Sequence, residues 1–127
     1  MEARQLAVEC RDLAESKKAE NIVVLDVRDV SSITDYFVIA TGTSEPHLRA
    51  IVEEIRQKLQ EAHGLAPRAT DGTLQTAWVV LDYFDVIVHV MRTDAREHYD
   101  LEGLWSDAPK VRARKRPAPR KRAETAK

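Results

Sequence analysis

The sequence has little of what membrane, secreted and metal-binding proteins depend on. Cys10 is the only cysteine, which excludes an internal disulfide and a cysteine-based metal site and favours a reducing compartment. The longest apolar runs, 22–25 and 86–91, are too short to span a bilayer, and the N-terminus has no apolar segment of the kind found in a secretory signal. The four histidines lack the spacing of metal ligands. We therefore expect a cytoplasmic protein with no membrane segment, bound metal or cofactor.

Charge is divided unevenly between a body at 1–109 and a tail at 110–127. The chain has 20 Lys and Arg and 21 Asp and Glu, and nine of these bases but only one of the acids lie in the tail. Eleven bases and twenty acids remain in the body, whose net charge is −9. An acidic body suits a basic protein partner better than a nucleic-acid backbone. The tail has no apolar periodicity, so we expect it to be disordered and to be the part suited to RNA contact.

The pattern of apolar residues predicts eight elements in the body. They are a helix at 3–19, strands at 22–27 and 35–41, a helix at 45–62, an edge strand near 66–70, strands at 76–82 and 85–91, and a short helix from Thr93 or Asp94 to Tyr99. This order predicts an α+β fold, with a mixed five-stranded sheet and helices mainly on one face.

The last two predicted strands form a hairpin with two different faces. If Asp82 pairs with Asp85 across a turn at Tyr83-Phe84, then Trp78 lies opposite His89. One face is aliphatic and is expected to pack on the helices; it comprises Ala77, Val79, Leu81, Val86, Val88 and Val90. The other face mixes acids with an aromatic, a histidine and a thioether; it comprises Trp78, Val80, Asp82, Asp85, Ile87, His89 and Met91. Such a mixture is typical of a recognition surface, and the alternative is that another element covers this face and makes Trp78 part of the core.

The T-G-T-S segment at 41–44 raises the question of an enzyme. It resembles the Gly-Ser turn of nucleotidyltransferases but matches neither a nucleophile elbow nor a phosphate loop. Those transferases follow the turn with paired carboxylates that hold magnesium. Here Glu53 and Glu54 are adjacent on a predicted helix and cannot both face one metal, while Asp82 and Asp85 flank a turn. A structural turn with a helix cap is favoured, and a divergent nucleotidyltransferase remains the alternative.

Three sequence blocks follow one another in a recognisable order. They are S-S-I-T-D-Y-F-V-I-A-T-G-T-S at 31–44, D-V-I-V-H-V-M at 85–91, and Y-D-L-E with L-W at 99–105. Together they closely resemble the signature of the ribosomal silencing factor family, also called the Iojap-like family, over most of residues 4–108.

This resemblance implies both a fold and a function. The fold would be α+β with nucleotidyltransferase-like topology but without the catalytic acids. The function would be non-enzymatic: binding the large ribosomal subunit at its intersubunit face, through that subunit's basic protein number fourteen. Members of the family sterically block association with the small subunit and so repress translation under nutrient limitation. Free members are often homodimers, and organellar relatives act in ribosome assembly, so a large-subunit assembly factor is an alternative.

This chain departs from the family pattern at two positions. Asp71-Gly72 stands where Glu-Gly is usual, which keeps the charge. Phe84 stands at the hairpin tip where glycine is usual, which leaves the tip conformation open and offers an added apolar contact. The basic tail lies outside the resemblance, which therefore assigns it no role.

The hairpin and the resemblance together predict a contact surface for a basic ribosomal protein, with Trp78 as its anchor. This surface comprises Asp71, Trp78, Asp82, Tyr83, Asp85, His89 and Met91. A rival prediction is a general RNA-binding module driven by the tail, which would bind weakly and with strong salt dependence.

Overall fold

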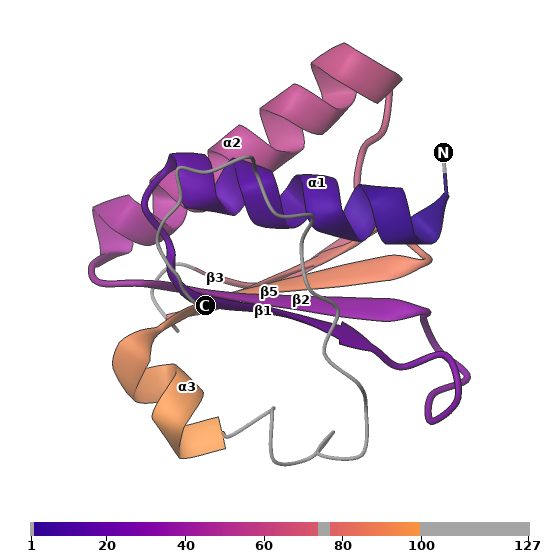
Figure 1. The fold of residues 1–127 in the computed structure, drawn as a ribbon. Helices are drawn as coiled ribbons and strands as arrows, with labels where there is room; N and C mark the ends of the chain where they lie inside the picture. Colours follow the sequence, from indigo (N-terminus) through magenta and orange to yellow (C-terminus); the bar gives the residue numbers. More distant parts are fainter. Residues whose placement is uncertain (1, 74–76, 100–127) are drawn as a thin grey trace, which may run out of the picture.

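A computed structural model describes residues 2–73 and 77–99 as one β-sheet with helices packed on it (Figure 1). In chain order the elements are α1 (Ala3–Ser16), β1 (Glu20–Asp26), β2 (Tyr36–Gly42), α2 (Glu45–His63), β3 (Ala69–Thr73), β4 (Trp78–Asp82), β5 (Val86–Arg92) and α3 (Thr93–Tyr99). The predicted tail lies outside the described residues, so the division into a body and a tail stays a prediction.

The five strands lie in the order β1-β2-β5-β4-β3. The central strands β2 and β5 run parallel, whereas the pairs β1–β2, β4–β5 and β3–β4 are antiparallel. A parallel pair needs a long crossover, and the segment containing α2, β3 and β4 supplies it. The predicted mixed five-stranded sheet is confirmed.

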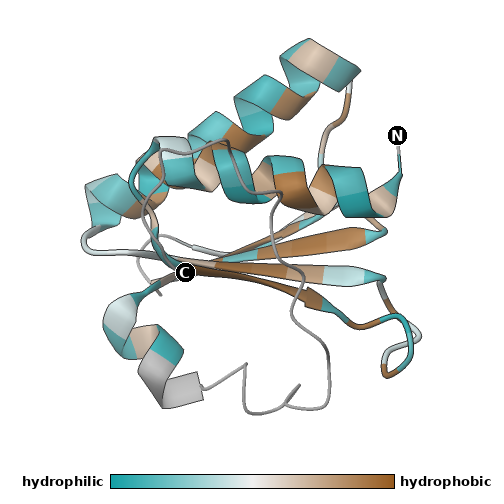
Figure 2. Ribbon diagram, viewed as in Figure 1, coloured by the Kyte–Doolittle hydropathy of each residue, from teal (hydrophilic) through white to brown (hydrophobic). Residues whose placement is uncertain are grey.

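Helices α1 and α2 cover one face of the sheet and enclose the larger core. Figure 2 shows hydrophobic strands beneath helices whose outer sides are hydrophilic. The α2 side chains buried in this core are Leu48, Ile51, Val52, Ile55 and Leu59. Their spacing of three and four residues forms a single apolar stripe along the helix. Ser44 caps the start of α2 by accepting a hydrogen bond from the His47 backbone N–H (3.2 Å), and Gly64 ends it at φ +66°.

The opposite face carries a second apolar cluster and the short helix α3. The buried members are Leu25, Val27, Phe37, Ile39, Ile87 and Met91, and Trp78, Val80 and Ala95 pack against them. Ala95 belongs to α3, which lies across the sheet from α1 and α2 (Figure 1). The buried Arg96 ties α3 to the sheet by donating hydrogen bonds to the Asn21 carbonyl oxygen and to Thr41 Oγ1. Helices therefore lie mainly, but not only, on one face.

The hairpin register differs by two residues from the sequence prediction. Asp82 lies opposite Ile87, and Trp78 lies opposite Met91 instead of His89. The turn is centred on Phe84-Asp85, because the Tyr83 N–H donates to the Val86 carbonyl (2.8 Å) and Phe84 takes the left-handed φ of +79°. A slip by an even number of residues keeps every side chain on its face. The predicted aliphatic face thus meets the helices through Val79, Leu81, Val86, Val88 and Val90.

Two other boundaries move for backbone reasons. Helix α1 ends at Ser16, three residues before the predicted end, because Lys18 leaves the helical region with φ +64°. Strand β3 begins at Ala69 instead of near 66, beyond Pro67, which has no N–H to donate to a ladder.

Candidate partner-binding surface

Strand β3 is exposed along its whole length. Asp71 lies opposite Val80, so its side chain shares a face with Trp78. Gly72 permits the close pairing of β3 with β4, because its φ is +75° and a Cβ there would lie 2.0 Å from the Trp78 carbonyl oxygen. The Asp71 carboxylate accepts a hydrogen bond from the Gly72 N–H (2.8 Å). An exposed acid is therefore positioned beside the tryptophan strand.

Trp78 and His89 form a hydrogen-bonded pair on the sheet face opposite α1 and α2. The Trp78 indole N–H donates to His89 Nδ1 at 3.0 Å, and Phe37 meets the imidazole edge-on at 5.3 Å between ring centroids. Burial lowers the pKa of His89 to about 4. His89 is therefore neutral near pH 7, with Nδ1 free of a proton and able to accept from Trp78.

Asp82 organises the hairpin tip. One of its carboxylate oxygens accepts a hydrogen bond from the Phe84 N–H (2.8 Å), and the other pairs with Arg68 Nε at 3.2 Å. The Arg68 guanidinium also lies 4.7 Å from the centre of the Phe84 ring. Asp85 is exposed beside them. The two predicted acids thus have different roles, because Asp82 is engaged within the tip and Asp85 faces solvent.

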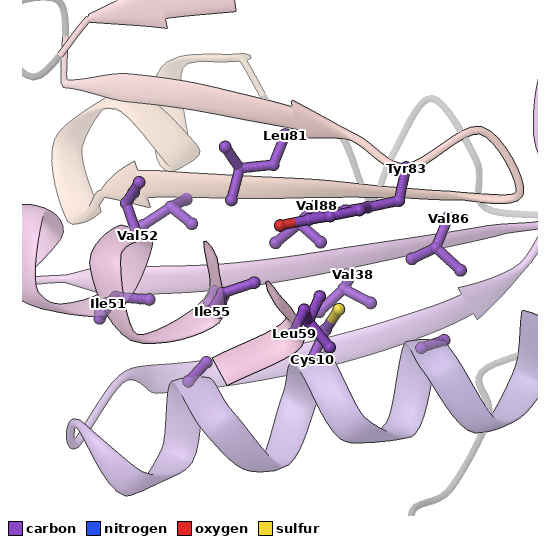
Figure 3. Packing of buried hydrophobic residues seen from close by; sticks show 14 of the residues in the cluster. Cys10, Val38, Ile51, Val52, Ile55, Leu59, Leu81, Tyr83, Val86 and Val88 are labelled. Atoms are coloured by element: carbon purple, nitrogen blue, oxygen red, sulfur yellow. The ribbon is translucent and has the colours of Figure 1, made fainter. Parts of the chain in front are cut away.

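Two predicted contact residues are buried, which removes them from the surface in this conformation. Tyr83 is only 8% exposed and points to the helix side, where Figure 3 shows its ring beside Val88. Met91 is 0% exposed and belongs to the second apolar cluster. Tyr83 was expected in the turn, but the shifted register places it opposite Val86 on the core face. Met91 lies at the far end of β5, beneath the region where α3 packs.

What remains of the predicted set is a partly acidic strip along β3, β4 and the hairpin tip. Asp71 and Asp85 are exposed, while Trp78, Asp82 and His89 are partly buried. We call these five residues the hairpin surface.

The segment at 41–44 has a structural explanation. Ser44 is the N-cap of α2, and His47 Nδ1 accepts a hydrogen bond from the Thr43 N–H (2.9 Å). His47 Nε2 lies 2.8 Å from the Lys17 carbonyl oxygen, which joins this turn to the end of α1. Within residues 2–73 and 77–99, no three His, Cys, Asp or Glu side chains gather so as to hold a metal ion. Among the same residues, no helix is long and apolar enough to cross a membrane.

The sequence prediction did not include three exposed apolar residues at one end of the sheet. They are Val30, Ile33 and Phe84. Phe84 carried a signal, since an aromatic residue at a hairpin tip is unusual. Val30 and Ile33 lie in a loop without periodicity, so no pattern in the sequence marked their exposure.

The fold and this surface define a small α+β protein whose exposed edge strand carries Asp71. The chain belongs to the ribosomal silencing factor family: the family described as "Ribosomal silencing factor during starvation" matches residues 1–127. The match extends over the whole chain and so corrects the expectation that the tail lies outside the resemblance.

Individual relatives support this assignment. The chain is 43% identical to a ribosomal silencing factor of Halalkalibacterium halodurans over 87% of this chain and 91% of the relative. It is 40% identical to that of Bacillus subtilis over 75% of this chain and 80% of the relative. A crystal structure of a Chromobacterium violaceum protein matches with a TM-score of 0.79 at 30% identity, covering 93% of this chain and 97% of that one.

Proposed function

We propose that this protein is a non-enzymatic cytoplasmic factor that binds the large ribosomal subunit at its intersubunit face. It contacts the subunit's basic protein number fourteen and sterically blocks association with the small subunit. Translation is thereby repressed when nutrients are limiting. The free protein is a homodimer, and the basic tail adds contact with ribosomal RNA.

The single observation that carries this proposal is the partly acidic and partly exposed strip of the hairpin surface in a chain of this family. Asp71 and Asp85 are exposed, and the partly buried Trp78 lies on the sheet face that Asp71 shares. Complementary charge steers a basic partner to such a surface, and the aromatic side chain of Trp78 supplies contact area.

Sedimentation through a sucrose gradient tests the proposal. The protein is expected with free large subunits and absent from intact ribosomes. Recovery mainly on whole ribosomes or on small subunits would contradict the mechanism. A subunit-joining reaction monitored by light scattering should also slow as the protein is added.

Charge-reversed variants test whether the hairpin surface carries the binding. Asp71→Lys is expected to weaken binding to large subunits at least fivefold. Glu53→Lys is the matched control, because it makes the same charge change at an exposed position of α2. This variant should bind large subunits as tightly as the wild type does. Equal affinity of the two variants would show that the hairpin surface does not contribute to subunit binding.

A second candidate is an assembly factor for the large subunit. One relative, 31% identical over 74% of this chain, is the mouse "Mitochondrial assembly of ribosomal large subunit protein 1". An assembly factor would bind precursor subunits and its loss would leave incomplete large subunits, whereas a silencing factor binds mature ones. Comparing its affinity for precursor and mature subunits separates the two. A divergent nucleotidyltransferase, the third alternative, would bind and turn over a nucleoside triphosphate with magnesium.

A further inference from the structure

Three large apolar side chains are exposed among the described residues, and all three lie at one end of the sheet. Ile33 is 66% exposed, Phe84 59% and Val30 45%. Val30 and Ile33 belong to the loop between β1 and β2, and Phe84 to the turn between β4 and β5. Both connections lie at the right-hand end of the sheet in Figure 1. We call Val30, Ile33 and Phe84 the end patch.

Hydrogen bonds join the two segments that carry the end patch. Thr34 Oγ1 donates to the Phe84 carbonyl oxygen at 3.0 Å. The backbone N–H groups of Asp35 and Tyr36 both donate to the Asp85 carbonyl, at 3.0 and 3.1 Å. The loop and the turn therefore form one surface held by the sheet, and the patch does not depend on two independently moving segments.

The exposed Phe84 has a backbone conformation that is unfavourable for a bulky residue. Its φ of +79° lies in the left-handed region, where a bulky residue is strained and glycine is not. Asp82 accepts the Phe84 N–H, and Arg68 lies against the ring. A turn with only a structural role would be made more easily by glycine. Strain that the surrounding structure maintains is characteristic of functional positions.

The charges around the end patch determine which partner it suits. Carboxylates outnumber guanidinium groups there, since the loop and the tip contain Asp26, Asp29, Asp35, Asp82 and Asp85 against Arg28 and Arg68. Both arginines are already engaged, Arg28 with Asp26 at 2.7 Å and Arg68 with Asp82 at 3.2 Å. The rim therefore presents a negative balance around an apolar centre, which complements a basic surface that contains aliphatic side chains.

We propose that the end patch is an apolar anchor for a basic protein partner, with Phe84 and Ile33 packing against aliphatic groups of a Lys- and Arg-rich surface. This inference rests on the proposed function, in which the partner is a basic protein of the large ribosomal subunit. Asp82 and Asp85 belong to the hairpin surface and also border the end patch, so the two surfaces are continuous. Three side chains alone fall far short of the roughly 800 Å² per partner of a stable interface, which disfavours a dimer formed by this patch alone.

Two substitutions remove the apolar anchor without loss of the fold. Phe84→Gly deletes the ring and relieves the left-handed backbone, so it should fold at least as well as the wild type. Ile33→Ser removes a side chain that is two-thirds exposed. Asn21→Gly is the control, because Asn21 also has a positive φ (+49°) but lies at the opposite end of β1. The full-length protein, labelled at its N-terminus, is titrated with purified large ribosomal subunits, and its oligomeric state is measured by sedimentation.

Each outcome bears on the proposal. Phe84→Gly and Ile33→Ser are expected to weaken binding at least fivefold, with Asn21→Gly within twofold of the wild type. If all three variants bind as tightly as the wild type, the end patch is not an anchor, although the proposed function stands. If the substitutions abolish self-association and leave subunit affinity unchanged, the patch belongs to a dimer and the proposal is wrong. If the wild-type protein does not bind large subunits, the proposed function fails and the anchor fails with it.

Discussion

The indole N–H of Trp78 donates to Nδ1 of His89 across neighbouring strands, at 3.0 Å. This bond requires an imidazole without a proton on Nδ1, and burial supplies that condition by lowering the pKa of His89 to about 4. Trp78 and His89 thus depend on each other. The histidine fixes the orientation of the indole, and the indole N–H supplies the hydrogen bond that the buried Nδ1 needs. The orientation of the predicted binding anchor therefore depends on a titratable neighbour.

Stability should fall when the solution is acidified. The unfolded chain protonates His89 near pH 6.5, but the folded protein takes up this proton only near pH 4. The unfolded state binds more protons between these values, so the free energy of unfolding decreases as pH falls from about 6.5 to 4, by at most about 3 kcal/mol. Urea unfolding monitored by tryptophan fluorescence at pH 7, 5.5 and 4.5 measures the loss.

A variant isolates the contribution of this histidine. His89→Asn keeps an acceptor close to the position of Nδ1 but has no proton to gain, so the difference in stability between wild type and variant should shrink as pH falls. A constant difference across this range would mean that other groups cause the acid sensitivity.

Trp78→Ala should weaken binding to large subunits by more than about 1 kcal/mol, the usual mark of an anchor residue. Trp78→Phe is the companion variant, because it keeps a smaller aromatic ring against the second cluster and lacks the N–H donated to His89. Circular dichroism verifies the fold of both before the affinities are compared. Full affinity in a folded Trp78→Ala protein would remove Trp78 from the contact surface.

The sequence was sufficient to predict the sheet, because the apolar runs of β2 and β5 are almost wholly buried and the helical periodicity of α2 agrees with its buried residues. Alternation assigned the two faces of the hairpin correctly even though its register was wrong, since a two-residue slip preserves the faces. The register itself depended on whether Phe84 takes a positive φ. Sequence preferences argue against that conformation for an aromatic residue, and the tertiary contacts of Arg68 and Asp82 maintain it.

The candidate site was harder to predict, because exposure depends on contacts between elements distant in the chain. Strand alternation predicted that the Met91 side chain would be exposed, yet it is buried on the face where α3 packs. Asp82 and Asp85 looked equivalent, yet Arg68 engages only Asp82. Ile33 had no periodic context at all. Local patterns therefore predicted that the hairpin exists but not which of its side chains reach solvent.

Tyr83→Phe should leave stability unchanged or raise it by up to about 1 kcal/mol. In the part of the chain that the structure describes, the Tyr83 hydroxyl is buried without a hydrogen-bond partner, and such a group costs desolvation free energy. Burial also raises the pKa of this phenol. Thermal unfolding compares the variants, with Tyr83→Ala as the control that should be strongly destabilised by loss of the ring. A clear loss of stability in Tyr83→Phe would reveal a partner for the hydroxyl.

Gly72→Ala should destabilise the fold by at least about 2 kcal/mol, since the new Cβ would lie 2.0 Å from the Trp78 carbonyl at a backbone φ of +75°. Gly64→Ala is the matched control, because Gly64 has a similar φ of +66° but an added Cβ there would meet no residue beyond its immediate chain neighbours within 4 Å. That variant should lose only about 1 kcal/mol. Urea unfolding measures both, and equal losses would show that crowding against β4 contributes nothing.

Deletion of residues 110–127 should leave most of the affinity for large subunits at physiological salt. The acidic strip and its apolar neighbours carry the proposed binding, whereas nine tail bases release counterions from RNA and so contribute a salt-dependent increment. The truncated protein should bind within about threefold of the wild type near 0.15 M salt and show a shallower dependence of affinity on salt concentration. A full-length variant with the tail Lys and Arg replaced by Gln separates charge from length and should behave like the deletion. If both variants lose binding, the tail drives association, and the protein is a general RNA-binding module instead of one that docks through its hairpin.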